Sequence, residues 1–177
     1  VVDSLISGVK YANSNKEFSP QEWSNSIWSL AKAGIQGPEE KLFPFVADLM
    51  DNSPGFLDAF KPQELSNTIW GVATILSKRP GQPEGDLNDA ALRICRHVGR
   101  QIVARQGERF RSQELTNSFW AMATLGFGNS YDSLKGERRD YTYLSSDDME
   151  SDNALLVATG NGVLGAAKSI IWRFRSQ

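Results

Sequence analysis

The fourteen residues FSPQEWSNSIWSLA, at positions 18–31, decide the fold because the chain repeats them. The pattern returns without gaps as FKPQELSNTIWGVA at 60–73 and as FRSQELTNSFWAMA at 110–123. The glutamines of the three copies are 42 and 50 residues apart, and the residues FRSQ at 174–177 repeat the start of the third copy. Internal repeats of this length are typical of architectures in which one structural unit is stacked on the next.

Each copy is expected to form a helix. In the first copy Ser19 can cap free backbone N–H groups, Pro20 lies where its missing N–H costs nothing, and Glu22 completes a capping box. The later copies place Lys61 and Arg111 at the capping position, so the starts of these helices are less well specified. The repeated segment therefore predicts three equivalent helices.

Steps of about 100° per residue divide each of these helices into two arcs. The arc that contains Trp28 is apolar or small, and we expect it to pack against neighbouring helices. The opposite arc carries a polar row at the same positions of every copy. Its members are Gln21, Asn25, Ser29 and Lys32, then Gln63, Asn67, Gly71 and Thr74, then Gln113, Asn117, Ala121 and Thr124. This row is the candidate functional surface.

Second helical segments of lower similarity lie between the copies, at 42–51 and 86–106, so each repeat is predicted to be a helical hairpin. Hairpins stacked side by side form an α-solenoid, in which one helix of every pair lines a concave surface. We therefore predict an all-α, right-handed α-solenoid of two-helix repeats.

The predicted units divide the chain as follows. They are the tail of a preceding repeat at 1–17, repeats at 18–59, 60–109 and 110–173, and the start of a further repeat at 174–177. The third repeat contains a long, polar and acid-rich insertion at about 127–153. Because the sequence opens on Val1 without a targeting segment, we interpret it as a fragment of a longer array.

The pattern Phe-x-Pro-Gln-Glu-x-Ser/Thr-Asn-x-x-Trp-x-x-Ala resembles the octotricopeptide repeat of organellar RNA-binding proteins and the related helical repeats of FAST kinase and RAP-domain proteins. The resemblance extends over nearly the whole chain, through three complete copies. It implies sequence-specific binding of single-stranded RNA in a chloroplast or mitochondrion, controlling transcript stability, processing or translation. The repeats are longer than the family's unit and no RAP domain is found in this sequence, so we expect no enzymatic activity.

On this interpretation the polar row contacts RNA. The residues expected to bind it are Gln21, Asn25, Ser29, Lys32, Gln63, Asn67, Thr74, Gln113, Asn117 and Thr124. An asparagine that is identical in every repeat cannot distinguish bases in a modular code, so the asparagines either form a hydrogen-bond ladder between repeats or contact RNA. The positions that vary, those of Ser29 and Lys32, either carry the code or belong to a solvated face.

The three repeated tryptophans, Trp28, Trp70 and Trp120, could stack on bases, but their place on the apolar arc favours the core. The glutamate that follows each repeated glutamine is expected to stabilise the start of its helix, where negative charge is favourable. These two side-chain types are therefore interpreted as structural.

Basic residues of the second helical segment are candidate phosphate contacts. Arg93, Arg96 and Arg100 share one face, although a charged outer face is the commoner explanation. The 19 lysines and arginines against 21 aspartates and glutamates give a net charge of −2, so any polyanion must be bound through local patches.

Composition excludes several other classes of protein. A single cysteine, Cys95, and a single histidine, His97, exclude an internal disulfide and any metal site built from several cysteines or histidines. Cys95 is expected to be a packed thiol, and His97 has no evident partner. No stretch of about 18 apolar residues is present, so no membrane-spanning segment is expected. We expect no cofactor and no small-molecule substrate.

Two alternatives to RNA binding remain. Gly160, Gly162 and Gly165 match the G-x-G-x-x-G of dinucleotide-binding enzymes, but only 12 residues follow, too few for a βαβ unit. Residues 155–177 also align without a gap with 91–113, which places them in the slot of a second helix. The stronger alternative is a protein-interaction scaffold of TPR or HEAT type that binds a partner peptide. The negative net charge favours this alternative.

Overall fold

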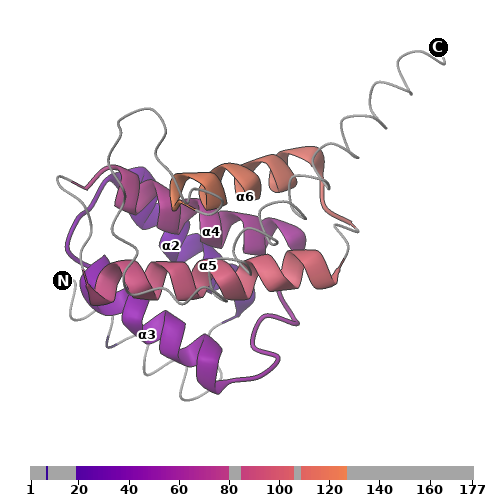
Figure 1. The fold of residues 1–177 in the computed structure, drawn as a ribbon, viewed down its shortest axis with the longest axis horizontal. Coiled ribbons are helices and arrows are strands. Elements are labelled where there is room, and N and C mark those ends of the chain that lie inside the picture. The colour runs from indigo at the N-terminus through magenta and orange to yellow at the C-terminus, as the bar shows by residue number, and fades with distance from the viewer. Residues whose placement is uncertain (1–6, 8–18, 80–84, 106–108, 127–177) are drawn as a thin grey trace, which may run out of the picture.

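A computed structural model describes residues 7, 19–79, 85–105 and 109–126 of the chain (Figure 1). The described part contains helices and no strands, which confirms the all-α class. The helices are α2 (Pro20–Ala33), α3 (Glu39–Asn52), α4 (Pro62–Ser77), α5 (Asp86–Ala104) and α6 (Ser112–Thr124). The three repeated segments are α2, α4 and α6, and the intervening segments are α3 and α5.

The helices contact one another in two groups. Helix α4 packs against α2 on one side and α6 on the other, whereas α3 packs against α5, and α4 also contacts α5 (Figure 1). Repeated helices that are separated in sequence are thus neighbours in space. This arrangement is repeat-like, and the stacking and handedness of an α-solenoid stay a prediction.

All three repeated helices begin with the same carboxylate bond. The backbone N–H groups of Ser19, Lys61 and Arg111 each donate to a carboxylate three residues on, at 2.7 Å in every case. In α2 the bond is reciprocated, because the Glu22 N–H donates to the Ser19 hydroxyl at 3.4 Å. Lys61 and Arg111 make no side-chain capping bond, so the later starts are less well specified, as expected, and depend on the bond to the glutamate.

The core lies between the two groups of helices. Leu65, Ile69 and Val72 of α4 are completely buried, as are Ile94 and Val98 of α5. These positions recur every three or four residues, so each helix directs one apolar stripe inward. The opposite stripe of α4 is therefore turned away from α5.

A glycine allows α2 and α4 to approach closely. A Cβ atom on Gly71 would lie 2.8 Å from Ile27 Cγ2 and 3.2 Å from the backbone carbon and oxygen of Ile27. Such distances are shorter than ordinary contacts, so only glycine fits without a shift of one helix. The Gly71 position is consequently part of a helix–helix contact.

The second helices differ slightly from their predicted bounds. The segment expected at 42–51 begins earlier, at Glu39, and contains Pro44 within the helix. The segment expected at 86–106 ends at Ala104. The predictions for 1–17, for the insertion at 127–153 and for the glycine cluster at 160–165 lie outside the described residues.

Candidate nucleic-acid interface

The repeated glutamines and asparagines lie on the side of α2, α4 and α6 that is turned away from the second helices. Gln21, Gln63 and Gln113 are exposed, and Asn25 is exposed as well. The other two asparagines, Asn67 and Asn117, are half-buried. Three equivalent helices thus present the same amide side chains on one side of the described molecule.

The asparagines do not form a ladder within the described part of the chain. The side chains of Asn25, Asn67 and Asn117 make no hydrogen bond to one another or to any other described residue. The bond that joins α4 to α6 comes instead from the Ser66 hydroxyl, which donates to the Glu114 carbonyl at 3.0 Å. The repeated amides therefore keep their donors and acceptors available for a ligand.

The variable positions of the polar row are less uniform than expected. Ser29 is exposed, but its counterparts Gly71 and Ala121 are buried, and Gly71 packs against α2. Lys32 is exposed, whereas Thr74 is only 5 % exposed and its hydroxyl has no hydrogen-bond partner among the described residues. Thr124, the counterpart of these two residues in α6, is half-buried.

The row is continued by the tryptophans, two of which do not lie in the core, contrary to expectation. Trp28 is 38 % exposed and Trp120 is 43 % exposed, while Trp70 is half-buried and packs against the core. The buried stripe of α2 is centred on Trp23 and Ile27. One further residue turns the helix by about 100°, so Trp28 falls at the edge of that stripe beside the polar row.

Lys32 joins two of these rings. Its ammonium lies 5.5 Å from the centre of the Trp28 ring and 5.1 Å from the centre of the Trp70 ring. Both distances are within the range of cation–π attraction, which is worth about 0.5–1 kcal/mol at exposed sites. The lysine of α2 is thereby held at the junction of α2 and α4.

The carboxylates of the repeated helices lie at the helix starts, as predicted. Glu22, Glu64 and Glu114 each accept the backbone bond that caps their helix. Hydrogen bonds from the side chain and backbone of Ser19 hold the pKa of Glu22 below its usual range. From each repeated asparagine to the end of its helix, Lys32 is the sole charged residue in the sequence.

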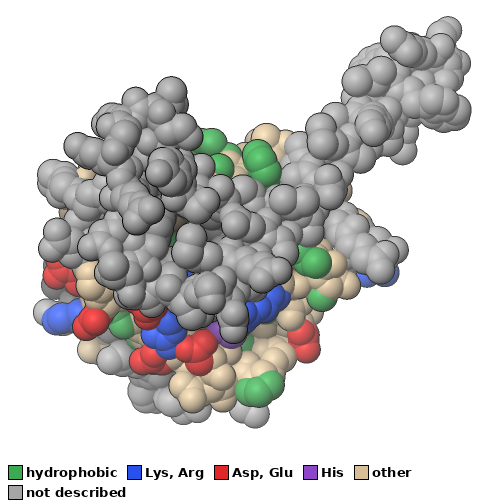
Figure 2. Space-filling model, viewed as in Figure 1, with side chains coloured by type: hydrophobic (Ala, Val, Ile, Leu, Met, Phe, Trp, Pro, Cys, Tyr) green, Lys and Arg blue, Asp and Glu red, His purple; other side chains and the backbone are tan. Residues whose placement is uncertain are grey.

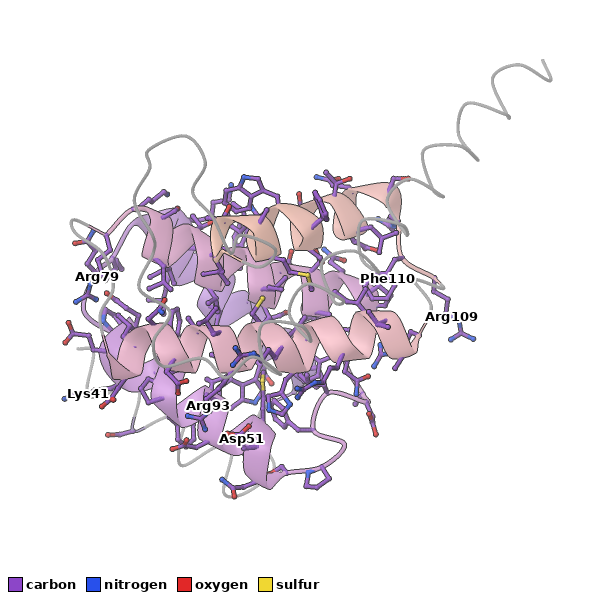
Figure 3. The ribbon with its side chains drawn as sticks, viewed as in Figure 1. Lys41, Asp51, Arg79, Arg93, Arg109 and Phe110 are labelled. Atoms are coloured by element: carbon purple, nitrogen blue, oxygen red, sulfur yellow. The ribbon has the colours of Figure 1, made fainter. Side chains whose placement is uncertain are left out.

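The arginines proposed as phosphate contacts lie in the other group of helices. Arg93 of α5 donates to Asp48 at 2.7 Å and to Asp51 at 2.9 Å, so its guanidinium joins α5 to α3 (Figure 3). Hydrogen bonds to Asp48 and then Asp51 raise the pKa of Arg93. Arg96 is buried and Arg100 is exposed. This geometry favours a structural role for Arg93 and leaves Arg100 as the more accessible of the three.

His97 belongs to the same ionic cluster. Its Nε2 atom lies 2.6 Å from Asp51 Oδ1, so the interpretation of a histidine without a partner was wrong. Acidic, basic and histidine side chains consequently alternate on the face of α3 and α5 (Figure 2). Cys95 is buried, as expected of a packed thiol.

A basic hollow at the start of α4 was missed by the sequence analysis. It has a volume of about 680 Å³, and its charged lining residues are Asp58, Lys61, Arg105 and Arg109. Arg105 donates to the Phe60 carbonyl at 2.5 Å, and Arg109 extends away from the helices (Figure 3). The lining residues come from separated segments, so the available signal was limited to basic residues near the repeated phenylalanines, Lys61 after Phe60 and Arg105 and Arg109 before Phe110.

The described residues contain no group of three histidine, cysteine, aspartate or glutamate side chains placed to hold a metal ion. Among the helices that the structure describes, none is long and apolar enough to cross a membrane. No family model, curated protein or solved structure matches the chain.

Proposed function

We propose that this chain is a module that binds single-stranded RNA, built as a right-handed α-solenoid of helical hairpins. The observation that carries the proposal is the recurrence of one side-chain row, glutamine then asparagine then tryptophan, on the same side of α2, α4 and α6. A ligand made of repeating chemical units matches a protein surface that repeats in the same way. A nucleic acid strand is such a ligand.

The side chains in the row have the chemistry that single-stranded RNA requires. Amides of Asn25, Asn67 and Asn117 can donate to phosphate and ribose oxygens and can pair with base edges. Because these residues are identical, they support general affinity and not the choice of base. Ser29 and Lys32 remain candidates for base discrimination, whereas the burial of Gly71 and Ala121 argues against the same role at their positions.

The charge distribution is compatible with an anionic ligand in spite of the net charge of −2. The glutamates of the repeated helices are bound at the helix starts, and Asp48 and Asp51 are paired with Arg93. Local neutralisation of this kind leaves Lys32 to set the sign of the potential near the tryptophans. We therefore propose binding that depends on salt.

The resemblance to octotricopeptide repeats supports a role in RNA stability, processing or translation in a chloroplast or mitochondrion. The same resemblance supports a binding role without an enzymatic reaction, a cofactor or a small-molecule substrate.

A protein-interaction scaffold is the second candidate, and one observation favours it. The outer side of α2 carries a hollow of about 430 Å³ whose lining includes Leu30, Ala33 and Ile35. Ile35 is exposed, and an exposed apolar surface is typical of a site that binds another protein.

The proposal is tested by measuring binding of the 177-residue chain to a labelled pool of random single-stranded RNA at two salt concentrations. A variant with Asn25, Asn67 and Asn117 all changed to alanine is compared with Asn52→Ala, which removes an exposed asparagine from α3. Circular dichroism monitors folding. We expect salt-dependent binding by the parent and the control, and at least tenfold weaker binding by the triple variant, because each lost polar contact costs about 1 kcal/mol.

Loss of helix in the triple variant would make the asparagines structural instead. A folded parent chain that binds no RNA at the lower salt concentration would overturn the proposal and favour the protein scaffold.

A further inference from the structure

We infer that Trp28, Trp70 and Trp120 form a platform on which successive RNA bases stack, with Lys32 as the cation that pairs with the strand. The inference rests on the proposed RNA-binding function. It assigns the base contacts to the tryptophans and the phosphate contact to Lys32.

The first argument for the platform is the exposure of the tryptophan rings. A single exposed aromatic residue on a protein surface needs no explanation, but here the same position of three equivalent helices leaves indole surface open to solvent. Trp23, which is buried, shows that the fold has room in its core for an indole where one is needed for packing. Trp28 and Trp120 are therefore not needed for packing the core, whereas Trp70 packs against the core with part of its ring and leaves the rest accessible.

The second argument is the order of the three repeated helices in space. Because α4 lies between α2 and α6, the three tryptophans follow one another across the surface in the order of the repeats. Single-stranded nucleic acids bind to rows of aromatic side chains because every base has a flat π face. A strand that crosses the three helices would meet one ring on each.

The third argument is the charge near the rings, which favours RNA over a peptide as the ligand of the platform. Lys32 is the sole charged residue between the repeated asparagines and the ends of their helices, so the platform is positive. The remaining polar groups along the row are uncharged amides. Positive charge beside exposed rings complements a phosphate backbone with attached bases.

The position of Lys32 suggests how a base is accepted. The ammonium lies over both Trp28 and Trp70 in the free protein. Lysine is a flexible side chain, so an arriving base can take the place of the ammonium over one ring while the ammonium turns to the phosphate of the same nucleotide. The free protein thus holds near Trp28 and Trp70 an ammonium group that the ligand can displace.

The inference is tested with two labelled probes of equal length, a twelve-nucleotide uridine RNA and a ribose–phosphate oligomer without bases. Anisotropy gives the affinity of the full chain for each probe. We expect the RNA to bind more tightly than the abasic probe, and Trp28→Ala and Trp120→Ala each to weaken RNA binding about tenfold with little effect on the abasic probe. Trp28→Phe, which keeps a ring, should retain most of the affinity.

The matched control is Val103→Ala, which removes an exposed apolar side chain from α5, away from the repeated helices. Circular dichroism and urea unfolding show whether each variant is folded. Lys32→Gln should lower the affinity for RNA and reduce its salt dependence, because the variant has no ammonium to pair with a phosphate.

The outcomes separate this inference from the function on which it rests. A parent chain that binds neither probe overturns both. Equal binding of both probes, or folded tryptophan variants that bind RNA as tightly as Val103→Ala, overturns base stacking while leaving RNA binding intact.

Discussion

Asp51 connects two helices through its carboxylate, which accepts hydrogen bonds from Arg93 and lies 2.6 Å from His97. Burial raises the pKa of Asp51, but the hydrogen bonds and charges of Arg93 and His97 outweigh it and lower the pKa below its ordinary value. The paired carboxylate therefore stabilises the fold above the pKa of the unfolded chain, about 3.9 for aspartate. This stabilisation is lost as the pH falls through the lower pKa of the folded protein.

We predict that Asp51→Asn makes the free energy of unfolding less dependent on pH below about pH 4. Asp51 is more than one third exposed, so screening by solvent limits the effect at neutral pH to about 1 kcal/mol or less. Urea unfolding at a series of pH values measures it. Asp58→Asn is the control, since Asp58 is an exposed carboxylate that accepts from Gln101 instead of an ion-pair partner. Parallel pH profiles for the two variants would contradict the prediction.

At the scale of single residues, sequence reasoning was most successful where the interaction is local. The carboxylate bonds at helix starts span three residues, so their chemistry can be predicted from the sequence. The ion pair of Arg93 with Asp51 spans 42 residues and depends on how α3 and α5 pack. The exposure of Trp28 also depends on packing, because a helical wheel places a residue on an arc without showing how much of that arc is covered.

At the scale of helices, the contact of α2 with α4 depends on the absence of a side chain at Gly71. We predict that Gly71→Val lowers the free energy of unfolding by about 1–3 kcal/mol, because the added atoms would overlap the side chain and backbone of Ile27. Chemical denaturation measures the change. Ala33→Val adds a branched side chain at an exposed position of α2 and should cost much less.

Equal destabilisation by the two valines would show that α2 and α4 move apart at little cost. The expected result would instead explain why this position of the polar row cannot face a ligand. Its neighbours along the helix, Asn67 and Trp70, are then the residues that the α4 helix presents.

The helices themselves could be predicted because apolar residues recur at helical spacing and because proline is the first residue of two of the repeated helices. Their mutual packing could be predicted only in part. The repeat indicates that α2, α4 and α6 are equivalent, but the close approach at Gly71 and the burial of Ala121 follow from contacts that no single helix specifies. Ser29, Gly71 and Ala121 were therefore grouped as one kind of position although their environments differ.

At the scale of the whole molecule, bound RNA should stabilise the folded state. At a ligand concentration of one hundred times the dissociation constant, binding to the folded chain alone adds about 2.7 kcal/mol. For a chain of this size we predict an increase of about 5–10 °C in the melting temperature. A thermal scan with and without the twelve-nucleotide uridine RNA measures it.

The variant that combines Trp28→Ala with Trp120→Ala should bind about a hundredfold more weakly, so at that RNA concentration its melting temperature should rise by only about 1 °C. The abasic probe provides a second comparison. An equal increase with both probes in the parent chain would attribute the stabilisation to the phosphates and not to the bases.

The repeats are unequally spaced in the sequence, but their helices are direct neighbours in space. Helix α3 has 14 residues and α5 has 19, yet both are followed by a repeated helix that packs directly against the previous one. The interval between successive rings is therefore set by the width of a helix, about 8–10 Å, and not by the length of the intervening chain. The spacing of the rings on the outer side of the repeats therefore stays constant when the segments between the repeated helices become longer or shorter. Insertions in those segments could accumulate without shifting the register of a bound strand.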